Sequence, residues 1–136
     1  MKYCLDTNTV IYYLKGKYPT IERRLRELSP RNIFIPEMVV AELRFGALKS
    51  RQSKRNWQRI EAFMSPLTKL PFADEATNHY ADIRKSLETQ GQPIGPNDLI
   101  IASTARAYGT ILITRNTREF GKVSGLQIED WTESKN

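Results

Sequence analysis

The sequence predicts an α/β fold, a three-layer α/β/α sandwich around a central, mostly parallel sheet, in one domain that spans residues 1–136. Short apolar runs that are typical of buried strands alternate with segments whose apolar residues recur every three to four positions, as on one face of a helix. Strands separated by helical crossovers pair in parallel within one sheet. No internal repeat and no linker rich in Gly, Ser or Pro divides the 136 residues.

The first quarter of the chain predicts two strands and two helices. Residues Lys2–Asp6 form a short apolar run that ends on a carboxylate, which indicates a buried strand. Thr9–Leu14 follows as one or two helical turns. A helix opens at Pro19–Thr20 and ends before Pro30, because its apolar residues are spaced by four and three. Asn32–Ile35 is expected to be the second strand.

The next segments predict two helices and a third strand. Pro36 is suited to the first turn of a helix, where its missing N–H is not needed. Ser53–Met64 is expected to be a further helix, with Trp57 and Ile60 facing inward. The third strand is expected at Leu67–Leu70. The first of these helices carries an apolar stripe made of Val39, Val40, Leu43 and Ala47.

The second half of the chain predicts two helices and two strands. A long helix is expected over Ala73–Gln90, and Asn97 is a suitable N-cap for the next helix. Gly109 stands where a glycine commonly ends a helix. Thr110–Thr114 is the most strand-like stretch of the chain, and a last short strand is expected at Leu126–Ile128.

The composition excludes several classes of protein. With 40% hydrophobic and 26% charged residues, it is that of an ordinary globular chain, and not of a disordered or collagen-like one. The single cysteine, Cys4, excludes an internal disulfide framework and a zinc site made of several cysteines. No apolar run approaches the roughly 18–20 residues of a membrane span, and Asp6 interrupts any signal-peptide stretch. We therefore expect a cytoplasmic protein without a membrane partner.

Positive charge is concentrated in one stretch of the sequence. The net charge is +6, and the segment Arg44–Arg59 contains six basic residues and no acid. Lysine and arginine clusters of this kind bind the phosphates of nucleic acids, although a solvated helix face explains an isolated cluster equally well. The candidate RNA-binding residues are Arg44, Lys49, Arg51, Lys54, Arg55 and Arg59.

Four acidic residues follow strands or stand in early helical turns. Asp6 ends the first predicted strand, and Glu119 lies five residues after the strand that ends at Thr114. Asp98 and Glu42 lie early in two helices, on or beside their apolar faces. In an open parallel sheet, ligands bind in the crevice beyond the carboxyl ends of the strands. The four carboxylates are expected to converge there.

Each acid also has a structural explanation when it is taken alone. Asp98 can stabilise the N-terminus of its helix, an effect of about 0.3–1 kcal/mol. Glu42 can pair with Arg44, and Glu119 can be a turn residue. Asp6 requires a partner, because a buried carboxylate without one is costly. Together they repel one another unless a cation lies between them, and Mg²⁺ prefers carboxylate oxygens and water. The combination indicates metal-assisted hydrolysis of a phosphodiester.

Four motifs in this order resemble the PIN domain and, more narrowly, the VapC toxins of bacterial VapBC toxin–antitoxin pairs. They are Leu5-Asp6-Thr7-Asn8, Val40-Ala41-Glu42-Leu43, Pro96-Asn97-Asp98-Leu99-Ile100-Ile101-Ala102 and Thr114-Arg115-Asn116-Thr117-Arg118-Glu119-Phe120. The resemblance covers essentially the whole chain, including its length.

The resemblance implies an endoribonuclease that depends on Mg²⁺ or Mn²⁺. Asp6, Glu42 and Asp98 match the acids that bind the metal directly or through water, and Glu119 matches the fourth acidic position. Many members have Asp at that fourth position, and Glu is one methylene longer. Polar positions that line the pocket in the family are matched by Thr7, Asn8, Thr114 and Asn116.

The resemblance also implies partners and a mechanism. Activated water attacks a phosphodiester in line, which leaves a 5′-phosphate and a 3′-hydroxyl. The implied substrate is a structured RNA, with tRNA favoured. The implied partners are a second copy of the chain, in a homodimer, and a VapB-type antitoxin whose tail enters the acidic crevice. The basic stretch Arg44–Arg59 is then expected to hold the RNA backbone.

Three alternatives fit the sequence less well. A phosphoryl-transfer enzyme of the haloacid dehalogenase type needs a second Asp two positions after Asp6, where this chain has Asn8. A receiver-like signalling domain needs an acidic pair before the first strand ends and a Lys after a late strand. A non-enzymatic RNA-binding module explains the basic surface but leaves the four carboxylates without a purpose.

Overall fold

A computed structural model describes residues 1–133, and confirms the predicted α/β fold. The last three residues of the expected domain lie outside this range. Every recorded strand pairing is parallel, in the order β3-β2-β1-β4-β5. The strands are β1 (Tyr3–Leu5), β2 (Ile33–Pro36), β3 (Thr68–Leu70), β4 (Ile111–Ile113) and β5 (Ile128–Glu129).

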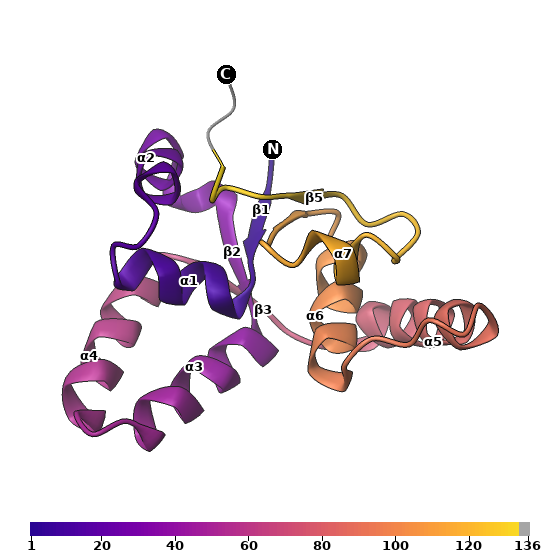
Figure 1. Cartoon of the computed structure of the whole chain (residues 1–136), viewed down its shortest axis with the longest axis horizontal. Coiled ribbons are helices and arrows are strands. Elements are labelled where there is room, and N and C mark those ends of the chain that lie inside the picture. Colours follow the sequence, from indigo (N-terminus) through magenta and orange to yellow (C-terminus); the bar gives the residue numbers. More distant parts are fainter. Residues whose placement is uncertain (134–136) are drawn as a thin grey trace.

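Helices cover the two faces of this sheet. In Figure 1, α1 to α4 lie on one side of the strands and α5 to α7 on the other. This division follows from the strand order, because right-handed crossovers change face when the chain reverses its direction of travel across the sheet. The helices are α1 (Thr7–Leu14), α2 (Pro19–Glu27), α3 (Glu37–Lys49), α4 (Ser53–Met64), α5 (Asp74–Thr89), α6 (Pro96–Ala107) and α7 (Thr117–Phe120), with a 3₁₀ turn at Pro30–Asn32.

The core forms around the central strands. Leu5 pairs in register with Ile113, and both side chains are fully buried. A strand that is buried on both faces has apolar residues at every position, rather than apolar and polar residues in alternation. This explains why the central strands are continuous apolar runs in the sequence. Cys4 is also buried, and burial raises the pKa of its thiol, so it behaves as a small apolar side chain.

Several predicted boundaries are wrong by one or two residues. Pro36 is the last residue of β2 and the N-cap of α3, rather than part of the first helical turn. Gly95, and not Asn97, caps α6, because Pro96 occupies the first helical position. The helix after β1 begins at Thr7 instead of Thr9, since Asp6 itself caps it.

The structure differs most from the prediction near the C-terminus. The last strand is Ile128–Glu129 rather than Leu126–Ile128. The four-residue helix α7 was not predicted, because a single turn is too short to show an apolar period. Gly109 does end α6 with φ of 65°, as predicted. Within residues 1–133, no helix has the length and apolarity needed to span a membrane.

The strand order determines where a ligand site can form. From β1 the chain crosses to β2 on one side, and from β4 it crosses to β5 on the other. Neighbouring strands whose connections leave in opposite directions open a crevice at their carboxyl ends. Asp6 and Thr114 directly follow these two strands.

Candidate active site

Asp6 directly follows β1 and caps the next helix. It is the N-cap of α1, where its Oδ1 accepts a hydrogen bond from the Thr9 backbone N–H at 2.8 Å. The residue is only 6% exposed. Burial raises the pKa of its carboxyl and the charge of Glu42 adds to this, whereas hydrogen bonds from Thr114 and Thr9 oppose the rise. The site therefore holds a carboxyl group in an environment unfavourable to its charge.

Glu42, on α3, is fixed by two hydrogen bonds. The Thr7 hydroxyl donates to its Oε1 at 2.5 Å, and the Asn97 amide donates to its Oε2 at 3.2 Å. Both carboxylate oxygens are thus held, and α3 is tied to the first turns of α1 and α6. Sequence reasoning missed Asn97 as a site residue and assigned it to a cap, although its place beside Asp98 was the available signal.

Asp98 gives the clearest sign that the four acids converge. It is half-buried in the first turn of α6. Burial raises the pKa of its carboxyl first, followed by the negative charges of Glu42, Asp6 and Glu119. Glu42 lies on α3, Asp6 caps α1 and Glu119 lies on α7. One carboxyl group therefore experiences the charge of all the others.

Glu119 lies at the edge of the group. It is on α7, and Lys122 donates a hydrogen bond to its Oε1 at 3.2 Å, so a neighbouring cation already balances its charge. Asp6, Glu42 and Asp98 form no ion pair with a basic side chain among the residues that the structure describes. The fourth acid is therefore distinct from the first three.

Two of the four predicted polar residues, Thr114 and Thr7, contact an acid. Thr114 is fully buried next to Asp6, and its Oγ1 accepts a hydrogen bond from the backbone N–H of Asn116 at 2.9 Å. The Asn116 and Asn8 side chains are exposed, at the starts of α7 and α1. Thr7 contacts Glu42, as described above. The structure thus brings three of the four predicted polar residues to the end of β4 or into contact with an acid.

A divalent cation fits the donor set in a specific way. Across residues 1–133, no three Asp, Glu, His or Cys side chains lie close enough together to ligate one ion directly. Mg²⁺ binds through one or two carboxylates and keeps several water ligands. The residues therefore fit a hydrated divalent cation that one or two of these carboxylates would hold, with water as its other ligands. They do not fit an ion enclosed by all four acids.

The basic stretch is divided between structural and exposed residues. Arg44 forms an ion pair with Glu61 at 2.8 Å and lies over the ring of Trp57, with 5.5 Å between its Cζ and the ring centroid. Arg59 donates a hydrogen bond to the Leu14 carbonyl at 2.5 Å. These two arginines connect α4 to α3 and α1.

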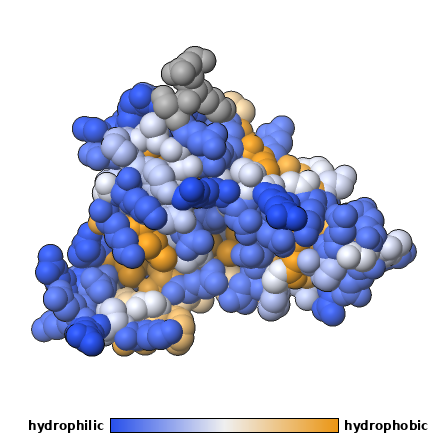
Figure 2. Space-filling model, viewed as in Figure 1, coloured by the Kyte–Doolittle hydropathy of each residue, from blue (hydrophilic) through white to orange (hydrophobic). Residues whose placement is uncertain are grey.

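The remaining basic residues of the stretch point to solvent. Arg51, Lys54 and Arg55 are exposed at the turn between α3 and α4, and Lys49 lies near the ring of Phe45. A groove of about 300 Å³ runs from Glu42 to Arg59 between these helices and α1. Figure 2 shows apolar surface gathered there, within a largely hydrophilic face. Its apolar walls include Ile11, Leu14, Leu43, Ala47 and Ile60.

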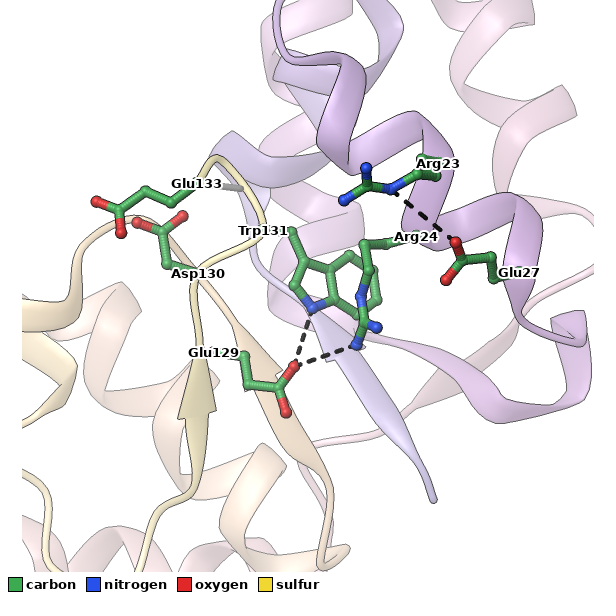
Figure 3. A pocket seen from close by; sticks show the side chains of 7 residues that line it. All are labelled: Arg23, Arg24, Glu27, Glu129, Asp130, Trp131 and Glu133. Atoms are coloured by element: carbon green, nitrogen blue, oxygen red, sulfur yellow. Dashed lines mark hydrogen bonds and ion pairs between the residues drawn. The ribbon is translucent and has the colours of Figure 1, made fainter. Parts of the chain in front are cut away.

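A second cavity, of about 460 Å³, lies away from the acids (Figure 3). Arg24 lies over the ring of Trp131 and pairs with Glu129 at 3.4 Å, and the Trp131 indole donates to the same carboxylate at 3.0 Å. Both arginines that line this cavity are paired, Arg24 with Glu129 and Arg23 with Glu27. No predicted site residue contributes to it.

Known proteins resemble this chain over nearly its full length. The family model described as the PIN domain matches residues 3–126. The tRNA(fMet)-specific endonuclease VapC of Shigella flexneri is 40% identical over 132 residues, which are 97% of this chain and 99% of that protein.

Solved structures of toxin–antitoxin complexes share the fold. VapBC2 from Rickettsia felis, bound to a DNA fragment from its promoter, matches with a TM-score of 0.90 and 36% identity, over 96% of this chain and 99% of that one. DNA-bound VapBC from Salmonella typhimurium matches with a TM-score of 0.90 and 38% identity, over 96% and 98%. The match extends over nearly the full length of both chains and includes the segments that carry all four acids. This chain belongs to the PIN domain family, among its VapC members.

Proposed function

We propose that this chain is a metal-dependent endoribonuclease, the toxin of a type II toxin–antitoxin pair, which hydrolyses phosphodiester bonds of structured RNA. The observation that supports this most strongly is the position of Asp98, whose carboxyl is influenced by the charges of Asp6, Glu42 and Glu119 at the point where the strand order reverses. An RNA-binding module has no use for such a group, because acids repel the phosphates that it must hold.

In this proposal Asp6 and Asp98 hold the ion and Glu42 acts through water. When bound, Mg²⁺ or Mn²⁺ supplies activated water and neutralises charge on the phosphate. The chain's own residues fix the geometry. Thr9 and Thr114 orient Asp6, while Thr7 and Asn97 orient Glu42. Attack by water, rather than by a ribose 2′-hydroxyl, leaves a 5′-phosphate and a 3′-hydroxyl.

Substrate and partners follow from the relatives. The Shigella protein is named a tRNA(fMet)-specific endonuclease, and we propose a tRNA as the substrate here. The Rickettsia and Salmonella chains were solved as VapBC complexes, and we propose a VapB-type antitoxin and a homodimer for this chain. A basic antitoxin side chain is a suitable partner for Asp6, Glu42 and Asp98, because none of these acids forms an ion pair within residues 1–133.

The test is cleavage of bacterial tRNA by the purified chain with Mg²⁺ and after chelation of metal. We expect cleavage only with metal, and we expect Asp6→Asn and Asp98→Asn to abolish it. Asp74→Asn is a matched control, because Asp74 stands in the first turn of α5 as Asp98 does in α6, and it lies outside the acidic group. Equal cleavage by Asp98→Asn and Asp74→Asn contradicts the proposal.

A further inference from the structure

Two tyrosines and two cations form a cluster at the far end of α1. The rings of Tyr12 and Tyr18 meet edge to face, with 5.1 Å between their centroids. The Lys17 Nζ lies 5.1 Å from the Tyr12 centroid and 5.5 Å from that of Tyr18. From the loop after β4, Arg115 lies over the Tyr18 ring at 5.4 Å and donates a hydrogen bond to its hydroxyl. We call these four residues the Tyr18 cluster.

The cluster borders the acidic site through the backbone. Arg115 directly follows Thr114, whose hydroxyl bonds to Asp6. Tyr12 lies on the same helix as Thr7, which holds Glu42. Positive charge therefore begins one residue after Thr114, which contacts Asp6, so a chain bound at the acids can extend to this cluster.

The charge of this cluster is not balanced by acids, unlike that of similar pairs elsewhere. Four arginines lie over aromatic rings in the described part of the chain. Arg24, Arg44 and Arg84 each also pair with a glutamate. Neither Arg115 nor Lys17 pairs with a carboxylate within residues 1–133. Both cations are exposed, while both rings are partly buried and so held in place.

We propose that the Tyr18 cluster binds an unpaired nucleotide of the RNA next to the bond that is cleaved, an inference that rests on the proposed function. Lys17 and the edge of the Arg115 guanidinium hold a flanking phosphate. The exposed plane of that guanidinium, which lies over the Tyr18 ring, provides the stacking surface for the base. Aromatic side chains and cations are the groups that bind single-stranded RNA. An acidic peptide needs the cations but has no use for a base-stacking surface.

The binding experiment uses a short, fluorescein-labelled single-stranded RNA of mixed sequence. Fluorescence anisotropy measures its Kd in an Asp98→Asn background, which prevents cleavage. We expect Tyr18→Leu to raise the Kd by about 5- to 150-fold, the usual effect of losing the aromatic part of a base stack, because Arg115 then has no ring to lie over. Arg115→Gln should lower the salt slope of log Kd by about 0.7, since one phosphate contact is lost. Tyr18→Phe, which keeps the ring, should stay within about twofold of its parent.

Tyr80→Leu and Arg84→Gln are the matched controls, because this pair has the same ring-and-arginine geometry on α5 but a charge balanced by Glu88. The inference is overturned if the Tyr18 and Arg115 variants bind the RNA as these controls do. Arg115 is exposed in a loop, so its variant remains informative if Tyr18→Leu fails to fold. In the Asp98→Asn background the assay measures RNA binding alone. The proposed function is tested separately, by cleavage of tRNA with the wild type, and absence of cleavage there refutes it.

Discussion

Replacing Asp98 by Asn should make the metal-free protein more stable. Asp98 experiences the negative charges of three other acids. Two unit charges 4 Å apart in water interact by about 1 kcal/mol. Lys122 balances part of the charge of Glu119, and solvent screens a half-buried group, so we expect the three charges together to contribute about 1–2 kcal/mol. This gain is partly offset, because the substitution also removes the favourable interaction of a carboxylate with a helix N-terminus, which contributes about 0.3–1 kcal/mol.

Urea unfolding in the presence of a chelator measures this balance. We expect Asp98→Asn to gain about 1 kcal/mol, which raises the Tm by about 3–5 °C for a chain of this size. Asp74→Asn loses only the helix interaction and should be destabilised by about 0.3–1 kcal/mol. Added Mg²⁺ should stabilise the wild type and leave Asp98→Asn unchanged, because only the wild type binds it. A loss of stability in Asp98→Asn equal to that in Asp74→Asn refutes the convergence of the acids.

Three further predictions concern Asp6, Arg106 and the basic residues between α3 and α4. First, burial raises the pKa of the Asp6 carboxyl in the folded state above its unfolded value of 3.8, so the folded state binds this proton more tightly. The protonated carboxyl therefore favours folding at low pH, and this stabilisation is lost as the pH rises through the folded-state pKa. The stability of Asp6→Asn relative to wild type, followed by circular dichroism without metal, should therefore grow with pH; a constant difference contradicts this. Second, Arg106→Ala should lower the free energy of unfolding, measured in urea, by about 2 kcal/mol. The reason is that this arginine donates hydrogen bonds to His79, Asp82 and the Ser124 carbonyl from a side chain that is only 15% exposed. A loss below about 0.5 kcal/mol would show that these bonds are not stabilising. Third, replacing Arg51, Lys54 and Arg55 together by Ala should weaken RNA binding and lower its salt slope by up to about 2–3, since each contact releases counterions. An unchanged slope would assign this turn to another partner.

Much of the fold could be predicted because its elements are locally determined. β1 and β4 are apolar runs that end at Asp6 and Thr114, and the parallel pairing of such strands requires their ends to meet. The same argument predicts that the acids converge. The boundaries that failed depend on competing local signals, as at Gly95, where the proline that follows fixes the start of α6 more firmly than Asn97 can cap it.

What could not be predicted depends on contacts between distant residues. Arg44 pairs with Glu61 through the packing of α3 on α4, so its charge is partly balanced although the segment Arg44–Arg59 contains no acid. Arg115 and Tyr18 are 97 residues apart, and no local pattern connects them. Asn97 reaches Glu42 only because α6 lies beside α3. Sequence periodicity predicts which face of a helix is buried, but not which polar side chains meet across two helices.

Binding of Mn²⁺, followed by the loss of its free-ion electron paramagnetic resonance signal, tests most directly whether Asp6, Glu42 and Asp98, from three separate segments, form one cation site. We predict saturable binding by the wild type, loss of that binding in Asp6→Asn, and full retention in Asp74→Asn. Binding by Asp6→Asn that equals the wild type, or no saturable binding by the wild type, contradicts the account.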